Sequence, residues 1–367
     1  MKYLILFFLS LFNCMAFAQT LQPGFSKSEY LETIKANARV HYDLDKWDSL
    51  DKIPPSQQYD FIYRSPVVGF ENMWDLWVAK NKSTAIIAVR GSVMTQASFL
   101  ANLYAAMVPA QGMLELEKNK PFHYELADHP NAAVHVGWLI AMAHLAPDIE
   151  NKIDSCYKKG IKQFILTGHS QGGGITFLLN AYLKHKQVKA GLPKDIVFKT
   201  YCSAGPKPGN LFFAYDYEKI NYSGWAYNVV NAADWVPDVP FSIQTVNDFT
   251  SVNPFRNAKQ AIKKMKFPNN LIVKHMYNKM DRPTRRAQKN FEKYLGRMTS
   301  KIVKKTLPDF QSPAYYKSNY YVRTGNIISL VPGPDYDQQF NNTPGNTNIW
   351  EHHLFGPYLY LTHQLPD

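Results

Sequence analysis

The stretch that constrains this chain most runs from Phe164 to Gly174, with the sequence Phe-Ile-Leu-Thr-Gly-His-Ser-Gln-Gly-Gly-Gly. Its apolar start predicts a short buried strand, and an amphipathic helix is expected from about Gly173. The turn between them must be very sharp, and glycines on both sides of Ser170 avoid the clash that a Cβ atom would cause. This arrangement is typical of a nucleophile elbow. The alternative is a glycine-rich turn whose serine only caps the helix.

The helix expected after Ser170 adds a second feature of chemical interest. Its first N–H groups have no acceptor within the helix, and the helix dipole places partial positive charge at this end. Such an end stabilises an oxyanion that develops beside a serine during acyl transfer. Ser170 is therefore the first candidate for a catalytic side chain.

Strand and helix patterns alternate along most of the chain. An N-terminal helical approach is expected up to about residue 66, because Tyr30, Ile34 and Ala38 share one helix face. The predicted strands span residues 74–79, 84–89, 164–167, 196–202, 225–230, 320–322 and 327–330. Several of them end in polar or glycine-rich loops. The pattern predicts an α/β fold, with a mixed, mostly parallel sheet flanked by helices and a site at its carboxyl edge.

The charge of the chain is unevenly distributed. The 367 residues are 46% hydrophobic, enough for one large core with an inserted segment. The formal net charge is +12, yet residues 256–305 hold sixteen Lys or Arg against only Asp281 and Glu292. The rest of the chain is therefore slightly acidic. A helix in this basic segment is expected to have an apolar stripe that consists of Phe291, Tyr294, Leu295, Met298 and Ile302.

The first residues indicate that the protein is exported. A basic start precedes an apolar run over residues 3–12, and small residues lead to Ala18. This predicts a signal peptide over residues 1–18, cleaved near Ala18, and hence a secreted or periplasmic protein. Cys14 allows lipid attachment as an alternative, although the residue before it is not small. No later apolar run is long enough to span a membrane.

We expect residues 19–240 and 320–367 to form the core and residues 241–319 to form a basic helical insertion, either a cap or a surface-binding segment. Two cysteines remain outside the signal peptide, Cys156 and Cys202. They are compatible with a disulfide in an exported protein and equally with two buried thiols. The sequence leaves both alternatives open.

A serine nucleophile needs a base and an orienting carboxylate, because a free hydroxyl is a poor nucleophile near neutral pH. In α/β hydrolases the three residues follow the order serine, acid, histidine, each in a loop after a strand. Asp234 follows the predicted strand 225–230, and the pair His352–His353 lies in a loop near the C-terminus. The candidates therefore occur in the required order.

Five separated segments together resemble one family, the class 3 lipases, which are α/β-hydrolase enzymes that cleave carboxylic esters of lipids. The segments are Arg90-Gly91-Ser92, Val134-His135-Val136-Gly137-Trp138, Gly168-His169-Ser170-Gln171-Gly172, Ala204-Gly205-Pro206-Lys207-Pro208-Gly209-Asn210 and Asn231-Ala232-Ala233-Asp234-Trp235-Val236-Pro237. They resemble the family's R-G-[ST], V-H-x-G-[FW], G-x-S-x-G, G-x-P-[RK]-x-G-N and N-x-x-D-x-V-P motifs, in the same order. The resemblance covers about residues 70 to 240, and the histidine loop rejoins it after the insertion.

The resemblance implies a role for each matching residue. Ser170 would be the nucleophile and Asp234 the orienting acid, and the backbone N–H groups of Ser92 and Gln171 would form the oxyanion hole. The family's activity implies no metal and no cofactor.

The resemblance also ranks the alternatives. His353 is preferred to His352 as the base, because the family's loop tends to have a tyrosine five residues after its histidine, as Tyr358 is here. Asp238 is a lesser alternative to Asp234, since it falls after the Val-Pro step of the motif.

Two departures from the family pattern affect the expected site. Position 171 is glutamine where many members have leucine, which is expected to make the pocket rim more polar. The span from Asp234 to His353 is about twice that of compact fungal members because of the insertion, which leaves the substrate class open. The apolar helix expected near residues 98–109 lies where the family has its lid, and it is either a lid or ordinary core packing.

The sequence therefore predicts an exported serine hydrolase that acts on lipid esters. A phospholipase A1-like enzyme or a short-chain esterase is the alternative within the same chemistry. A non-catalytic protein that binds surfaces through residues 241–319 is the alternative from another class. In either case the cations of this insertion are suited to an anionic membrane surface. Nucleic acid is not an expected partner, because the chain has an export signal and no nucleic-acid-binding motif.

Overall fold

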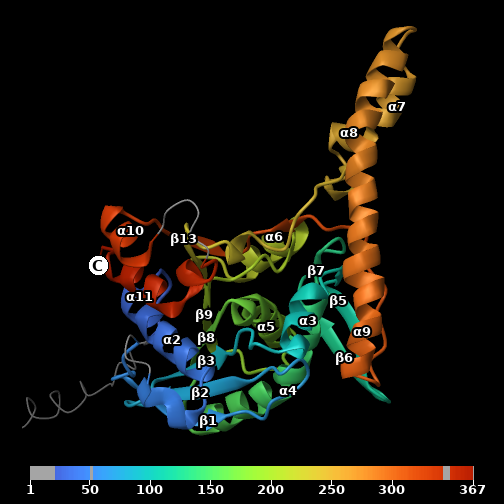
Figure 1. The fold of residues 1–367 in the computed structure, drawn as a ribbon. Helices are drawn as coiled ribbons and strands as arrows, with labels where there is room; N and C mark the ends of the chain where they lie inside the picture. Colours follow the sequence, from blue (N-terminus) through green and yellow to red (C-terminus); the bar gives the residue numbers. More distant parts are fainter. Residues whose placement is uncertain (1–20, 50–52, 342–347, 367) are drawn as a thin grey trace, which may run out of the picture.

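The computed structural model describes residues 21–49, 53–341 and 348–366, so the expected signal peptide and Cys14 lie outside the described residues. A seven-stranded sheet in the order β1-β2-β3-β8-β9-β11-β13 forms its centre (Figure 1). The first three strands pair antiparallel, and the strands from β3 to β13 are parallel. The predicted mixed, mostly parallel α/β fold is thus confirmed. The strands are β1 (Tyr59–Arg64), β2 (Trp74–Ala79), β3 (Thr84–Val89), β8 (Gln163–His169), β9 (Val197–Ser203), β11 (Ala226–Asn231) and β13 (Asn326–Leu330).

Helices cover both faces of this sheet. α2 and α11 pack on one face, and α4 and α5 pack on the other (Figure 1). The helices of the described chain are α2 (Lys27–Val40), α3 (Gln96–Leu103), α4 (Val136–Lys158), α5 (Gln171–Val188), α6 (Leu211–Ile220), α7 (Ala258–Lys263), α8 (Asn269–Glu292), α9 (Thr299–Thr306), α10 (Pro334–Phe340) and α11 (Phe355–His363). Within the described ranges, none of them combines the length and the apolar character needed to cross a bilayer.

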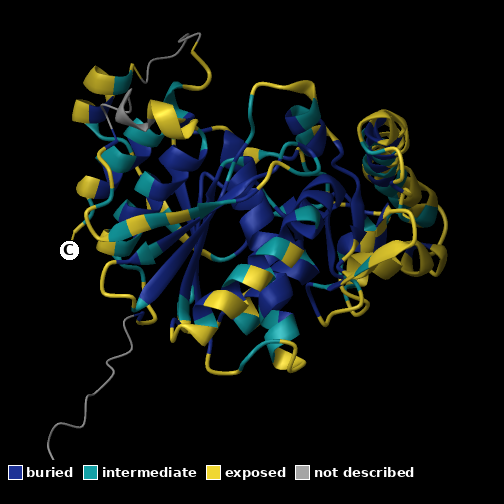
Figure 2. Ribbon diagram, turned by 90° about the horizontal axis from the view of Figure 1, so that it is seen from below, coloured by how far each residue is buried: buried dark blue, intermediate teal, exposed yellow. Residues whose placement is uncertain are grey.

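The alternation of β3 shows how one strand contributes to two cores. Ala85, Ile87 and Val89 belong to the apolar cluster on the side of α4 and α5, whereas Ile86 and Ala88 belong to the cluster on the side of α2. Both faces of the strand are apolar because both are covered, as is usual for a parallel sheet. The central strands are accordingly buried along most of their length (Figure 2).

A second, four-stranded sheet has the order β12-β10-β7-β4 and corrects one expectation. Its strands are β4 (Met107–Pro109), β7 (Ala133–His135), β10 (Gly209–Asn210) and β12 (Tyr321–Val322). The helix expected up to Val108 ends at Leu103, and Met107 and Val108 are fully buried strand residues. Most of residues 98–109 thus pack in the core, although Leu103 is 56% exposed, and this burial favours the packing alternative.

Two further segments for which no strand was expected contain strands. β1 adds an antiparallel edge strand to β2, and β5 (Gln111–Glu117) pairs with β6 (Lys120–Glu125) as a separate hairpin. In β5 only Leu114 and Leu116 are buried, so its alternation is short and lies among polar residues. Such a pattern is a weak strand signal.

The basic segment forms a long helical projection (Figure 1). From Phe291 onward it packs against the body: the Ala106 N–H donates to Leu295 O at 3.1 Å, and the side chains of Val303 and Phe310 are fully buried. Before Phe291, α8 extends beyond the body, with α7 packed alongside it.

The apolar stripe expected on this helix is only partly correct. Phe291 is buried, but Tyr294, Met298 and Ile302 are 49%, 50% and 53% exposed. The cause is a π-helical turn at Lys293–Met298, whose wider winding rotates the residues that follow it onto another face. Residues on that other face are buried instead, namely Thr299, Ser300 and Val303.

Cys156 and Cys202 are both free and buried, so the disulfide alternative is wrong. Cys156 lies in the last turn of α4, whereas Cys202 lies on β9 in the middle of the sheet. Burial raises the pKa of both thiols, which keeps them in the uncharged form.

Three buried histidines are held in the neutral form. Burial lowers the pKa of His41 and of His135 to about 3, and it lowers the pKa of His169 well below its usual value. The ring of His135 stacks on Trp138 with centroids 3.7 Å apart, and its Nδ1 accepts the Trp138 N–H. In the unfolded chain these histidines take up protons near pH 6.5, whereas in the folded protein they stay neutral. The free energy of unfolding therefore decreases as the pH falls from about 6.5 toward 3.

Replacing His135 by Gln should therefore flatten the acid dependence of stability. Between pH 7 and pH 5, His135 alone should remove about 2 kcal/mol from the free energy of unfolding. Urea unfolding at both pH values measures this loss, with His123→Gln as the control because His123 is exposed. Equal losses in the wild type and in His135→Gln would contradict a neutral His135.

Candidate active site

Ser170 sits in a strained turn between β8 and α5. Its φ and ψ angles are 62° and −131°, a conformation that non-glycine residues rarely adopt. The added Cβ of an alanine at Gly168 would lie 2.3 Å from the Gly172 carbonyl, and one at Gly172 would lie 2.3 Å from Val89 O. Both glycines are therefore required by close backbone contacts, as the sequence predicted.

Asp234 and His353 form a buried pair although 119 residues separate them. The distance from His353 Nδ1 to Asp234 Oδ2 is 2.7 Å. The same carboxylate accepts the Tyr358 hydroxyl on Oδ2 at 2.8 Å and the Val236 N–H on Oδ1 at 3.0 Å. A carboxylate with these donors is held in one orientation and stays a hydrogen-bond acceptor.

The alternative candidates have other partners. His352 Nδ1 lies 2.8 Å from the Tyr336 hydroxyl, and its ring is not part of the Asp234 pair. Asp238 is 70% exposed and accepts a hydrogen bond from Arg323 at 2.8 Å. The geometry therefore favours His353 over His352 and Asp234 over Asp238.

Asn231 holds the histidine loop against β11. Its Nδ2 donates to His352 O and to the Tyr336 hydroxyl, both at 3.0 Å, and its backbone N–H donates to the Tyr358 hydroxyl at 3.1 Å. The strand that leads to Asp234 thus also positions the loop of His353. This explains why an asparagine stands three residues before the aspartate.

His169 connects the elbow to the same loop. Its Nε2 lies 2.7 Å from His353 O, and a carbonyl oxygen only accepts, so Nε2 carries the proton. The neutral ring then accepts at Nδ1 from the Ser203 hydroxyl, 3.0 Å away. Ser203 Oγ in turn accepts from the Tyr30 hydroxyl at 2.7 Å. This chain of hydrogen bonds joins α2, β9, the elbow and the histidine loop.

The two N–H groups expected to form an oxyanion hole lie on the loop after β3 and at the first residue of α5. Neither the Ser92 nor the Gln171 N–H donates to an acceptor within the described part of the chain. Ser170 itself is half-buried, and its N–H donates to Ser203 O at 3.0 Å. Ser170 Oγ and His353 Nε2 are not hydrogen-bonded to each other in the described chain, as is common before a substrate binds.

The side chain of Gln171 corrects the expectation of a polar pocket rim. It is 2% exposed, and its Nε2 donates to Ser98 O and to Asn102 Oδ1, both at 2.9 Å. The glutamine therefore ties the elbow to α3 and adds little polar surface.

Asn102 is the centre of this network and was missed by the sequence analysis. Its Oδ1 also accepts the Trp138 indole N–H at 2.9 Å, and its Nδ2 donates to Ser92 Oγ at 3.0 Å. One amide thus links the elbow, the loop of Ser92, and α4. In the sequence, Asn102 is only a polar residue within an apolar helix, and no motif marks it.

Apolar side chains surround the histidine loop on its exposed side. The Trp350 ring lies 5.8 Å from the His353 ring and 5.2 Å from the Trp235 ring. Trp235 and Trp350 remain 40% and 37% exposed, and Leu354 is 55% exposed. An apolar ligand that reaches His353 would therefore meet aromatic and aliphatic surface.

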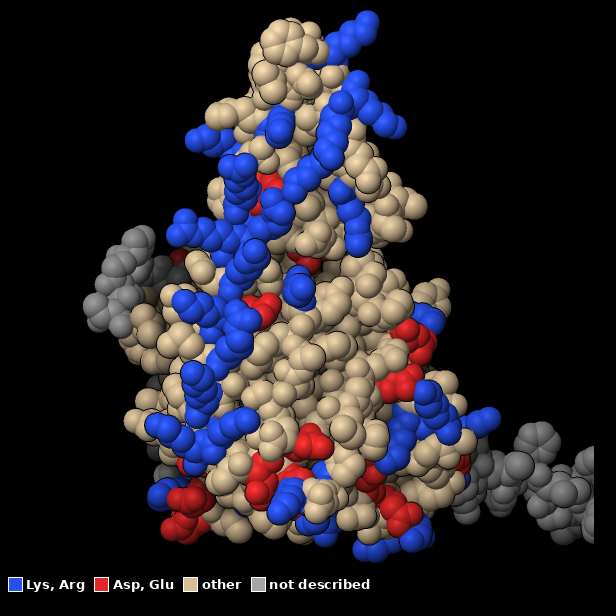
Figure 3. All heavy atoms as spheres, turned by 90° about the vertical axis from the view of Figure 1, so that its right-hand side faces the viewer, with Lys and Arg blue, Asp and Glu red and all other residues tan. Residues whose placement is uncertain are grey.

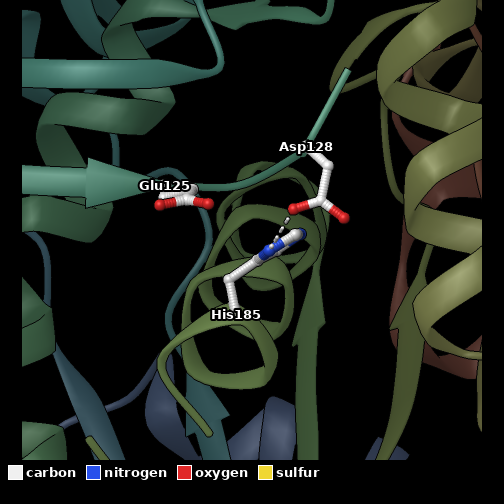
Figure 4. Close-up of side chains that lie close together, drawn as sticks. All are labelled: Glu125, Asp128 and His185. Carbon is white, nitrogen blue, oxygen red and sulfur yellow. Dashed lines mark ion pairs between the residues drawn. The ribbon is translucent and has the colours of Figure 1, made fainter. Parts of the chain in front are cut away.

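Another group of titratable residues lies away from this site (Figure 4). Glu125, Asp128 and His185 have donor atoms within 4.8 Å of one another. Their carboxylates already have cationic partners, since Glu125 pairs with Lys189, and Asp128 pairs with Lys219 at 3.2 Å. The group is an ion-pair cluster that connects the β5–β6 hairpin to α5.

A hollow of about 480 Å³ lies at the other edge of the sheet. It is lined by Ala226 and Asn326, where β11 and β13 begin. Ser170 follows the end of β8, which runs parallel to these strands. The hollow is therefore separate from the candidate active site.

Replacing Asn102 by Ala should destabilise the protein by about 1–3 kcal/mol, because the Gln171 amide and the Trp138 indole would lose their acceptor. Asn102→Asp keeps that acceptor and should lose less. Asn151→Ala, at an exposed position on α4, is the control and should change stability by less than about 0.5 kcal/mol. Urea unfolding compares the three variants, and equal effects of Asn102→Ala and Asn151→Ala would refute the network's role.

Comparison with known proteins is consistent with the motifs. Residues 86–244 match the family model of class 3 lipases. The secreted mono- and diacylglycerol lipase 1 of Fusarium solani is 32% identical over 108 residues, which are 29% of this chain and 29% of that protein. The chain thus matches less than a third of the length of this curated relative.

Two solved lipases are similar at lower identity. The Rhizomucor miehei lipase propeptide complex is 20% identical, with a TM-score of 0.41 over 60% of this chain and 65% of that one. The triacylglycerol lipase of Penicillium expansum is 14% identical, with a TM-score of 0.43 over 58% and 74%. All five motifs fall inside the segment that the family model matches. Over residues 86–244, this chain is similar to the class 3 lipases.

Proposed function

We propose that this protein is an exported serine hydrolase that cleaves carboxylic esters of lipids through Ser170, His353 and Asp234. One observation supports this most: a buried Asp234 carboxylate lies 2.7 Å from His353 Nδ1, and the His353 backbone is hydrogen-bonded to the residue before Ser170. A structural histidine has no need of this arrangement beside a strained serine. A base for a serine nucleophile requires it.

In this proposal each group has a task. His353 donates its Nδ1–H to Asp234, so Nε2 has the free lone pair and removes the proton from Ser170 Oγ. The serine oxygen attacks the ester carbonyl, and the N–H groups of Ser92 and Gln171 stabilise the oxyanion. The alcohol leaves with the proton from His353.

Water then completes the cycle. His353 takes a proton from the water, the hydroxide attacks the acyl carbonyl, and the same N–H groups stabilise the second oxyanion. Ser170 leaves with the proton from His353, and the free acid is released. These steps require no metal and no cofactor.

The surroundings of His353 favour lipid esters over small polar esters. Trp235, Trp350 and Leu354 offer exposed apolar surface beside the ring, suited to an acyl or alkyl chain. The Fusarium solani relative is named a mono- and diacylglycerol lipase, which agrees with this substrate class. A phospholipase A1-like or short-chain esterase activity would use the same groups.

Export is part of the proposal. The relative is named a secreted lipase, and residues 1–18 have the pattern of a signal peptide that is cleaved near Ala18. N-terminal sequencing of the exported protein should begin at Gln19. A diacylglyceryl-modified Cys14 would instead support the lipid-anchored alternative.

Ser170→Ala and His353→Asn should each lower kcat by about 10⁴-fold or more, because each removes a group that acts in the transition state. His352→Asn is the matched control and should retain most activity, since the His352 ring is hydrogen-bonded to Tyr336 and its backbone carbonyl to Asn231. Hydrolysis of nitrophenyl esters, emulsified triacylglycerol and phospholipid measures kcat and ranks the substrates.

A fluorophosphonate probe tests the nucleophile directly and should label the wild type but not Ser170→Ala. Equal losses in His352→Asn and His353→Asn would contradict the assignment of the base. Absence of both hydrolysis and labelling, with salt-sensitive binding to anionic vesicles, would favour the non-catalytic surface-binding alternative.

A further inference from the structure

The outer part of the basic insertion is a pair of packed helices. We call residues 258–290, which comprise α7 and α8 up to Asn290, the arm. Ile262 of α7 is buried against α8, and Asp281 of α8 pairs with Lys259 at 3.4 Å and with Arg285 at 2.5 Å. The arm is thus an ordered helical pair that extends away from the body (Figure 1).

One face of the arm is apolar and exposed. Ile272, Met276 and Met280 follow one another at four-residue steps on α8, and their side chains are 57%, 59% and 67% exposed. At the tip, Phe267 and Leu271 are 78% and 54% exposed. Exposed apolar side chains this close together indicate a binding surface, whereas single ones do not.

The apolar row lies on a face of α8 that the body of the protein covers farther along the helix, at Phe291. Phe291 lies eleven residues, about three turns, after Met280 on the same side of α8. It is buried in a cluster with Met107 and Tyr321. Among the described residues, no element covers the same face at Ile272, Met276 and Met280.

Cations accompany the apolar row along the arm. Those on α8 are Lys274, Lys279, Arg282, Arg285, Arg286 and Lys289. At the helical period Lys279 and Arg286 border the row of Ile272, Met276 and Met280, and the other four cations lie farther round α8. Asp281 is the only acidic residue of the arm, and it is buried between Lys259 and Arg285. Figure 3 shows the Lys and Arg side chains following the projection beside uncharged surface.

We propose that the arm docks this protein on an anionic phospholipid bilayer. In this arrangement Phe267, Ile272, Met276 and Met280 enter the boundary between headgroups and acyl chains, and Lys279 and Arg286 bind the lipid phosphates. The cations farther round α8 add an attraction that falls off within a Debye length. The inference rests on the proposed function only in that the bilayer supplies the lipid ester.

The combination of the two surfaces selects this partner. A nucleic acid would use the cations and leave the apolar row exposed to water. A second copy of the chain would cover the apolar row but would bring two sets of like charges together. An anionic bilayer satisfies both surfaces at once.

Vesicle binding tests the proposal. The mature chain with Ser170→Ala avoids hydrolysis of the vesicles, which contain phosphatidylcholine alone or with about 30% phosphatidylglycerol. At about 0.1 M salt we expect affinity for the anionic vesicles to be about tenfold or more above that for neutral ones. Cosedimentation and the salt dependence of binding measure this difference.

Two triple variants separate the contributions of the two surfaces. Ile272→Ser with Met276→Ser and Met280→Ser should weaken binding about tenfold at every salt concentration. Lys279→Gln with Arg282→Gln and Arg286→Gln should weaken it about tenfold at low salt and reduce the salt dependence.

Matched controls lie outside the arm at exposed positions. Val188→Ser is the apolar control, and Lys80→Gln with Lys118→Gln and Lys159→Gln is the basic control. All controls should bind within about twofold of the parent chain, because they leave the arm unchanged.

The readouts distinguish failure of this inference from failure of the proposed function. With Ser170 intact, the arm variants should hydrolyse a soluble ester normally and anionic vesicles more slowly. Loss of vesicle binding in the arm variants without any hydrolysis by the wild type would refute the hydrolase and keep the arm. Unchanged vesicle binding in both arm variants, or a shift from dimer to monomer as their only effect, would overturn the proposal.

Discussion

The close backbone contact beneath Ser170 is the constraint on which the rest of the site depends. The Gly172 position leaves no room for a Cβ atom against Val89 O, and Gly168 leaves none against Gly172. Since β3 and β8 are neighbours in the centre of the sheet, these contacts set the distance between the elbow and the loop of Ser92. Strain in the Ser170 backbone is tolerated because the surrounding strands and helices cannot relax it.

Fully satisfied polar groups extend this arrangement to the histidine loop. Asp234 is surrounded by donors from His353, Tyr358 and Val236, so its charge is compensated although it is buried. The neutral ring of His169 has a defined donor and a defined acceptor nitrogen, which gives the hydrogen bonds around it a single direction. Proton positions in the site therefore follow from burial and geometry together.

The sequence predicted those parts of the fold whose cause is local. The elbow and the strands β2, β3, β8, β9, β11 and β13 depend on apolar runs and glycines within a few residues, and the structure confirms them. Residues 98–109 were expected to form a helix, because Met107 and Val108 keep the helical period, although pairing with β7 makes them a strand. The π-helical turn at Lys293–Met298 likewise shifts the burial of later residues without a signal in the sequence.

The site was predictable to the extent that motifs encode it. Asp234 and His353 were chosen from the order of residues along the chain and from the position of Tyr358, and the structure brings these three together. Asn102 and Tyr30 could not be found in this way, because each meets its partners only through packing of distant elements. Long-range contacts of this kind leave no periodic pattern in the sequence.

The two ends of the basic insertion lie next to each other, and this bears on how the length of the insertion can change. Ile243 bridges Asn319, and the Ser318 hydroxyl donates to Asp248 at 2.5 Å, so the segment leaves the body and returns to it at one place. The entropy needed to close such a loop grows only with the logarithm of its length. Insertions and deletions between Asp248 and Ser318 therefore have little effect on the strands β11 and β13 that flank the insertion. The number of residues between Asp234 and His353 is free to change, while their side chains stay 2.7 Å apart.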